Sequence, residues 1–151
     1  SELYKIDTVT LRYFNVYSRC QKADGPYATA IANWMHSIRE GVPPFITGDG
    51  EQRRDMAHLE DVIAANIFAM EYESKFGGHY FDVGTGENIS LNEIKEIVLK
   101  YHPHLVFEYH PPREGDVLTT TANIEPLKDL GWGPKNKIFE GIERCFYKGE
   151  K

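Results

Sequence analysis

The sequence is poor in cysteine and in long apolar runs, and each absence excludes a class of protein. Two cysteines, Cys20 and Cys145, are too few for a disulfide scaffold in a chain of 151 residues, so we expect both to be reduced thiols. No apolar run reaches the ~18 residues of a membrane-spanning helix, and no basic-then-apolar signal opens the sequence. We therefore expect a cytoplasmic protein without a membrane partner.

Positive charge is also in short supply. The chain has 17 Lys and Arg residues against 23 Asp and Glu residues, a net charge of −6. An acidic surface repels phosphate backbones, so we expect no nucleic-acid partner. With 41% hydrophobic and 26% charged residues, the composition is globular rather than disordered. The length suits a single domain over residues 1–151.

Alternating strand and helix patterns predict an α/β fold. Runs of β-branched and aromatic residues predict strands, and apolar residues at helical spacing predict helices. The expected strands are 8–14, 45–47, 55–58, 79–83, 105–109 and 119–121, and the expected helices are 28–40, 60–72, 90–101, 123–131 and 138–147. Residues 15–25 are expected to form an irregular loop.

Local signals add detail to three of these helices. Ser90 and Glu93 have the spacing of a capping box at the start of the 90–101 helix. Asn123 is the expected N-cap of the 123–131 helix. Apolar residues at helical spacing form one stripe along the 60–72 helix. Its members are Ile63, Ile67 and Met70.

The run GDGEQRRD at residues 48–55 is the most informative in the chain. Its glycines allow positive φ and a close approach of the backbone to a ligand. Arg54 offers five donors in a planar fork that fits a phosphate bidentately, and Asp55 could hold that fork in place. Taken alone, the run is equally compatible with a surface hairpin that carries a solvated ion pair.

Two distant runs add further polar residues. In LRYFNVY at residues 11–17, Asn15 ends an apolar strand, and ligands of α/β folds bind outside the carboxyl ends of strands. The alternative is an Asx turn. In PREGD at residues 112–116, Arg113 follows a proline and Asp116 could orient it. The alternative there is an ordinary polar loop.

Together and in this order, the three runs resemble the C-terminal half of nucleotide-sugar epimerases of the extended short-chain dehydrogenase/reductase type. The resemblance covers nearly the whole chain and is strongest to UDP-glucose and UDP-N-acetylglucosamine 4-epimerases. It implies a Rossmann-like α/β fold, represented here by a small mixed sheet with helices, and a UDP-sugar as ligand. The site residues that it implies are Asn15, Arg54 and Arg113 at the diphosphate with Asp116 beside them, and Tyr27, Ile31, Trp34, Phe45 and Thr47 around the base and ribose.

The resemblance also implies NAD as the cofactor of the full enzyme. The sequence has no Gly-x-x-Gly-x-x-Gly run, so the dinucleotide-binding half is expected to be absent from this chain. The resemblance places the family's catalytic Tyr-x-x-x-Lys upstream of these residues. Tyr147 and Lys151 have the same spacing but lack the surrounding family motif, so they are not expected to be the catalytic pair. We expect no catalytic residue here. The expected function is the nucleotide-sugar-binding part of an NAD-dependent sugar 4-epimerase, inactive by itself.

Other functions stay open at this stage. Nucleotide-sugar 4,6-dehydratases and 5-epimerases share the scaffold, and a non-catalytic module that binds a nucleotide sugar or a protein partner is a third possibility. An RNA-binding relative is disfavoured by the acidic balance. The chain departs from the family pattern at residues 18–20, Ala32 and Met56, and the sugar is undetermined. His102, His104 and His110 are separated by Pro103 and an expected strand, so no metal site is expected.

The strands at 8–14 and 79–83 would belong to the parallel sheet of the full enzyme. Parallel strands are normally covered on both faces, and here most of their neighbours are missing. We therefore expect a homo-oligomer or association through uncovered strands. The residues expected to be partly uncovered are Val9, Leu11, Tyr13, Tyr80, Phe81 and Val83.

Overall fold

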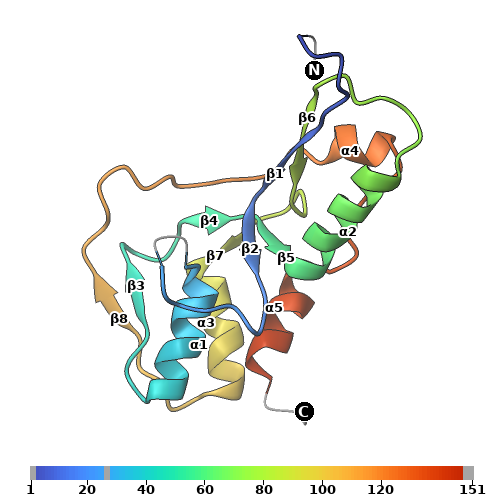
Figure 1. Cartoon of the computed structure of the whole chain (residues 1–151). Helices are drawn as coiled ribbons and strands as arrows, with labels where there is room; N and C mark the ends of the chain where they lie inside the picture. The colour runs from blue at the N-terminus through green and yellow to red at the C-terminus, as the bar shows by residue number, and fades with distance from the viewer. Residues whose placement is uncertain (1–2, 26–27, 148–151) are drawn as a thin grey trace.

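The computed structural model describes residues 3–25 and 28–147 (Figure 1). The described strands are β1 Thr10–Tyr13, β2 Asn15–Tyr17, β3 Phe45–Thr47, β4 Arg53–Arg54, β5 Met56–His58, β6 Tyr80–Val83, β7 Ile89–Ser90 and β8 Glu108–His110. The described helices are α1 Ala30–Glu40, α2 Leu59–Glu71, α3 Leu91–Tyr101, α4 Glu125–Asp129 and α5 Ile138–Phe146. The predicted α/β class is confirmed.

The strands pair two by two. β1 pairs with β6, β2 with β5 and β3 with β8, all in parallel, whereas β4 and β7 are antiparallel. A parallel pair needs a long crossover connection. Each of these three pairs therefore joins segments that are far apart in the sequence. The 8–14 and 79–83 segments, expected to be strands of a parallel sheet, contain β1 and β6, which pair with each other in parallel.

Two hydrophobic clusters fill the molecule, and the β2–β5 pair forms the wall between them. Successive side chains of a strand point to opposite faces. Tyr17 and Met56 accordingly pack into the larger cluster, with α1, α3 and α5, which lie together in Figure 1. Val16 and Ala57 face the smaller cluster, between α2 and the β1–β6 pair. One short strand pair thus joins both cores.

Helix ends follow local sequence signals. The Thr29 hydroxyl accepts a hydrogen bond from Ala32 N at 3.3 Å and caps α1, which ends at Gly41 in the left-handed region with φ of 69°. The predicted capping box of α3 is confirmed, because Ser90 and Glu93 satisfy each other's backbone N–H groups at 3.0 and 2.8 Å.

Three local predictions are wrong, and tertiary contacts explain each. Asn15 does not end a strand but begins β2, because residues 15–17 pair with β5. Residues 119–121 contribute only an isolated bridge from Thr119 to Arg53. Asn123 does not cap α4, which has no side-chain cap, and its N–H instead donates to Asp82 Oδ2 at 3.2 Å.

The apolar stripe of α2 faces away from the core. Ile63, Ile67 and Met70 are 50%, 44% and 77% exposed. The buried face of the helix carries Val62 and Ala65 instead. A helix with apolar residues on more than one side does not reveal from periodicity alone which side is buried. Among the residues that the structure describes, no helix has the length and apolar character needed to span a bilayer.

Candidate functional site

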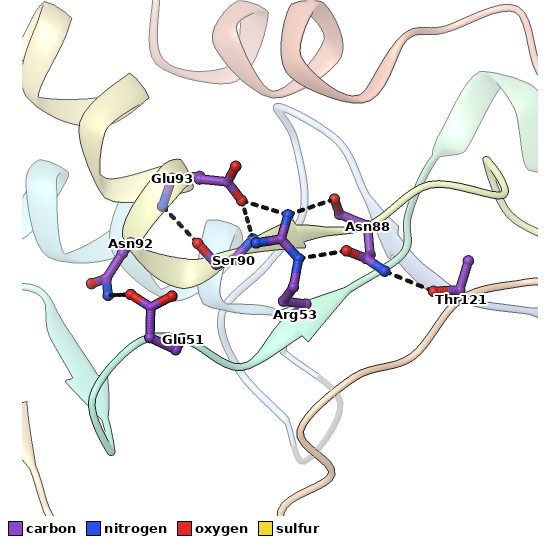
Figure 2. A network of polar contacts seen from close by, with 7 residues as sticks. All are labelled: Glu51, Arg53, Asn88, Ser90, Asn92, Glu93 and Thr121. Atoms are coloured by element: carbon purple, nitrogen blue, oxygen red, sulfur yellow. Dashed lines mark hydrogen bonds and ion pairs between the residues drawn. The ribbon is translucent and has the colours of Figure 1, made fainter.

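Strand β4 presents one arginine to each side. Arg54 lines a cavity, as does Gln52 two residues earlier. Arg53 points the other way, where its guanidinium donates to Asn88 Oδ1 at 2.6 Å and pairs with Glu93 Oε2 at 2.8 Å (Figure 2). Since residues i and i+2 of an extended chain share a face, Gln52 and Arg54 form the inner wall of the cavity while Arg53 holds the framework behind it.

The cavity has a volume of about 230 Å³. Its wall comes from β2, α1, β3, the β4 segment, β5, α3 and the 113–116 loop, which are segments spread over most of the chain. Residues of both chemical types line it: polar Asn15, Thr29, Asn33, Thr47, Gln52, Arg54, Arg113 and Asp116, and apolar Ala28, Ala30, Trp34, Phe45, Met56, Leu91 and Ile94.

Asp116 holds Arg54 in the wall of this cavity. Nη2 of Arg54 lies 2.5 Å from Asp116 Oδ1, and the two side chains are 18% and 34% exposed. Nη1 of Arg54 also donates to Arg53 O at 2.9 Å. Arg113 lines the same cavity and has no ion pair within the described ranges 3–25 and 28–147. Two guanidinium groups therefore border one small cavity in an acidic protein.

The predicted role of Asp55 is wrong. Its side chain is fully buried and does not contact the Arg54 fork. It accepts hydrogen bonds from Thr85 N and Thr85 Oγ1 at 2.8 Å, from Gly86 N at 2.9 Å and from Ala122 N at 3.0 Å. A buried carboxylate needs such partners, so Asp55 ties the β4–β5 segment to two other segments. Asp116, which was expected to orient Arg113, orients Arg54 instead.

Asn15 lies in the cavity wall, and the nitrogen of its carboxamide is already hydrogen-bonded. Its Nδ2 donates to Asp55 O at 2.8 Å, which leaves the carboxamide oxygen to face other groups. Trp34 is buried, and its indole N–H donates to Phe45 O at 2.8 Å. Phe45 stacks on His110 with ring centroids 4.7 Å apart. These contacts fix the apolar side of the cavity.

The structure thus brings most of the predicted site residues to one place. Seven of them line the cavity: Asn15, Trp34, Phe45, Thr47, Arg54, Arg113 and Asp116. Ile31 does not, because it is fully buried in the larger cluster. Tyr27 lies outside the described residues. Sequence reasoning missed Gln52, although its position two residues before Arg54 in an extended run was a usable signal.

The network behind the cavity is shown in Figure 2. Asn88 Nδ2 donates to Thr121 Oγ1 at 2.8 Å, and Asn92 Nδ2 donates to Glu51 Oε1 at 2.6 Å. The backbone N–H of Ser90, which donates to the Glu93 carboxylate, holds the pKa of that carboxyl below its ordinary value. These bonds connect the start of α3 to the β4 segment.

A second cavity is larger, at about 620 Å³, and carries none of the predicted residues. Arg19 and Arg144 line it together with His58 and Glu60. Glu60 offsets part of the positive charge, and size alone does not mark a binding site. We regard the smaller cavity as the candidate site because its polar groups converge from separate segments. In the described part of the chain, no group of three metal-ligating side chains occurs.

Parallel strand pairs linked through helices, with a cavity between them that is bordered by arginines, define an α/β protein suited to an anionic ligand. The particular family follows from comparison. The model of the NAD dependent epimerase/dehydratase family matches residues 1–84, more than half of the chain. The chain belongs to this family, as the resemblance of its motifs predicted.

Solved structures of family enzymes are similar to the chain. The UDP-glucose 4-epimerase of Thermotoga maritima, solved with UDP-glucose, is 31% identical with a TM-score of 0.85 and aligns with 96% of this chain. The UDP-N-acetylglucosamine 4-epimerase of Methanobrevibacter ruminantium, in complex with UDP-N-acetylmuramic acid, is 32% identical with a TM-score of 0.84 over 96% of this chain.

A third relative was solved with the cofactor. The UDP-glucuronic acid 4-epimerase of Bacillus cereus, in complex with UDP-glucuronic acid and NAD, is 26% identical with a TM-score of 0.85 over 96% of this chain. The chain spans 46% of the length of each of these three proteins. The fold of an extended short-chain dehydrogenase epimerase is therefore shown over less than half of such an enzyme.

NAD is the cofactor of the family, and the glycine-rich turn after β6 does not fit its pyrophosphate. A phosphate needs free backbone N–H groups. Here the N–H groups of Thr85 and Gly86 already donate to the Asp55 carboxylate. A Cβ added at Gly84 would lie 2.5 Å from Ala122 Cβ and 2.9 Å from Asp55 Oδ2. The turn packs against protein, as expected for a tight strand exit.

Proposed function

We propose that the cavity between Arg54 and Arg113 binds the diphosphate of a nucleotide sugar. The observation that carries the proposal is that two arginines far apart in the sequence line one cavity. Guanidinium groups match phosphate oxygens in geometry and charge. The relatives that were solved with UDP-sugars support uridine diphosphate as the nucleotide portion.

In this proposal Asp116 holds Arg54 ready for the ligand. The Arg54 and Asp116 side chains are only 18% and 34% exposed, so the guanidinium is oriented before a phosphate arrives. Asn15 adds an uncharged polar group nearby, and Trp34, Phe45 and Thr47 border the base and ribose. A clamp of this kind also orients the sugar, which a reaction at one ring carbon requires.

We propose further that residues 1–151 act as one domain, the nucleotide-sugar-binding part of an NAD-dependent sugar 4-epimerase. The β2–β5 pair supports this, because it joins both hydrophobic clusters. By itself the chain binds without turnover, because no glycine-rich dinucleotide run occurs in its sequence. Incubation with NAD and UDP-glucose should yield no UDP-galactose, and measurable conversion would contradict this part of the proposal.

Calorimetric titration with UDP tests the clamp. Arg54→Ala and Arg113→Ala should each weaken binding more than tenfold, because a hydrogen bond to a charged group contributes about 1.5–3 kcal/mol. Arg54→Lys, which keeps the charge and loses the planar fork, should lie between Arg54→Ala and the unsubstituted chain.

A matched control is Arg39→Ala. Arg39 lies in the last turn of α1, is exposed and does not line the cavity. This variant removes the same charge from the protein, so it accounts for any long-range effect. Equal UDP affinity of the unsubstituted chain, Arg54→Ala and Arg113→Ala would refute the clamp.

A further inference from the structure

Gln52 is a buried polar residue in the cavity wall. The family motifs described above assign no role to this residue. It is 7% exposed, and its backbone oxygen accepts from Leu91 N at 3.3 Å. Its side chain lines the same cavity as Arg54. A buried carboxamide without partners is costly, at about 1–3 kcal/mol for each unsatisfied group. The orientation of this amide is therefore informative.

The contact with Thr47 decides which end of the amide faces the cavity. Gln52 Nε2 lies 2.7 Å from Thr47 O. A backbone carbonyl oxygen only accepts hydrogen bonds, so the amide nitrogen, and not the oxygen, must face it. The carboxamide oxygen of Gln52 points elsewhere and accepts no hydrogen bond from any residue in the described ranges.

This oxygen is not fully enclosed by protein atoms, and Gln52 is one of the residues that line the cavity. The enclosed side-chain atoms without a partner in the described part of the chain belong to Tyr17, Thr120 and Trp132, and Gln52 is not among them. The cavity therefore contains an acceptor with no donor of its own. A ligand that supplies an N–H or O–H group would satisfy this acceptor.

The surroundings favour a flat heterocycle at this acceptor. The apolar side chains of Phe45, Leu91 and Ile94 line the same cavity. Gln52 and Arg54 are separated by one residue on an extended segment, about 7 Å along the chain. A nucleoside diphosphate places its base and its first phosphate at opposite ends of the ribose, a separation of that order.

We propose that Gln52 determines base specificity, with its carboxamide oxygen accepting a hydrogen bond from the imide N–H of uracil. Cytosine has a lone pair at the corresponding ring nitrogen. Two acceptors would then face each other, and the buried Gln52 oxygen would stay unsatisfied. The site therefore selects uridine over cytidine diphosphate. This inference rests on the proposed diphosphate clamp.

The test is calorimetric titration of UDP and CDP against the unsubstituted chain, Gln52→Met and Arg54→Ala. The unsubstituted chain should bind UDP roughly tenfold more tightly than CDP, the size expected of one hydrogen bond. Gln52→Met keeps the side-chain length, removes the acceptor and should bring the UDP-to-CDP affinity ratio close to one. Arg54→Ala should weaken both ligands by the same factor and leave the ratio unchanged.

The outcomes separate this inference from the proposed function. Equal affinity of the unsubstituted chain for UDP and CDP would overturn the inference without any variant. An unchanged ratio in Gln52→Met, with both ligands weakened, would show that the residue only supports Thr47 and would overturn it too. Absence of UDP binding to the unsubstituted chain would instead remove the proposed function, and this inference with it.

Discussion

Arg53 and Arg54 are neighbours in the chain that serve two different structures. Arg54 lines the cavity and pairs with Asp116, whereas Arg53 pairs with Glu93 and bonds Asn88 on the opposite side. The two arginines have the same chemistry and almost the same local sequence. What separates them is the alternation of an extended chain, which gives one residue to the ligand site and the other to the framework.

Tyr17 and Gly141 pack against each other in the larger hydrophobic cluster, with the tyrosine hydroxyl next to the glycine Cα. The Tyr17 hydroxyl is buried without a hydrogen-bond partner among the described residues, and burial raises its pKa. A Cβ at Gly141 would collide with that hydroxyl. A glycine inside α5 would ordinarily be replaced by alanine with a gain in helix stability. Here the tyrosine hydroxyl fills the space.

We predict that Gly141→Ala lowers the free energy of unfolding by about 1–3 kcal/mol, because it overpacks the core. In a Tyr17→Phe background the loss should be much smaller, since the colliding oxygen is gone. Urea denaturation of the two single variants and the double variant measures the coupling. The same loss in both backgrounds would show that the collision is not the cause.

At the scale of the element, α3 supports the site from behind. The capping box at Ser90 fixes where the helix begins, and Glu93 of that box also pairs with Arg53. Leu91 and Ile94 from the same first turns line the cavity. The start of α3 therefore carries both the rear framework of β4 and part of the ligand-facing wall.

The Glu93 carboxyl has a lowered pKa in the folded protein, chiefly because Ser90 N donates to it. Because the folded pKa lies below the unfolded value, the Glu93 carboxylate contributes stability that is present above the ordinary glutamate pKa of about 4.3 and is lost as the pH falls through the lowered folded pKa. Glu93→Gln should therefore reduce the acid dependence of unfolding. Because the Glu93 side chain is 40% exposed, the effect at neutral pH should stay below about 1 kcal/mol.

Glu96→Gln is the matched control for this helix. Glu96 is exposed on α3, and no ion pair of its side chain occurs among the described residues. Thermal melts between pH 3 and pH 7 should show the altered acid dependence in Glu93→Gln alone. An equal change in both variants would point to net charge rather than to the capping box.

On the scale of the whole molecule, α2 and β1 expose an apolar surface. Ile63, Ile67 and Met70 form a stripe along α2, and Tyr13 at the end of β1 is 49% exposed. The Tyr13 hydroxyl donates to Asn66 Oδ1 at 2.9 Å, so the ring lies beside this stripe. The expectation of partly uncovered strands is confirmed for Val9, Leu11, Tyr13, Tyr80 and Phe81, but it is wrong for Val83, which is fully buried.

We predict that this surface makes the chain self-associate. Contiguous exposed apolar groups and a two-stranded parallel pair with free edges favour contact with a second copy. Light scattering after size exclusion should give a mass that rises with concentration. The double variant Ile63→Lys with Ile67→Lys should stay monomeric at concentrations where the unsubstituted chain does not.

Phe139→Lys provides the control, because Phe139 is 49% exposed on α5, away from the α2 stripe. It should leave the association unchanged. A monodisperse monomer of the unsubstituted chain at every concentration would contradict the prediction. It would mean that the exposed stripe is too small to hold a second copy.

Local signals in the sequence determined the α/β class, the ends of α1 and α3, and the runs that carry Asn15, Arg54 and Arg113. These features depend on residues a few positions apart, such as a cap and the N–H group that it accepts. The family motifs preserve the same kind of short-range pattern, which is why the site could be assembled from three separate runs.

Only the tertiary structure decided which partner each polar group takes and which apolar face is buried. Asp55 binds the 85–86 turn rather than Arg54, and Asp116 binds Arg54 rather than Arg113. The exposed stripe of α2 consists of residues as apolar as those of a buried helix face. Such choices depend on which distant segments meet in space, and sequence spacing contains no measure of that distance.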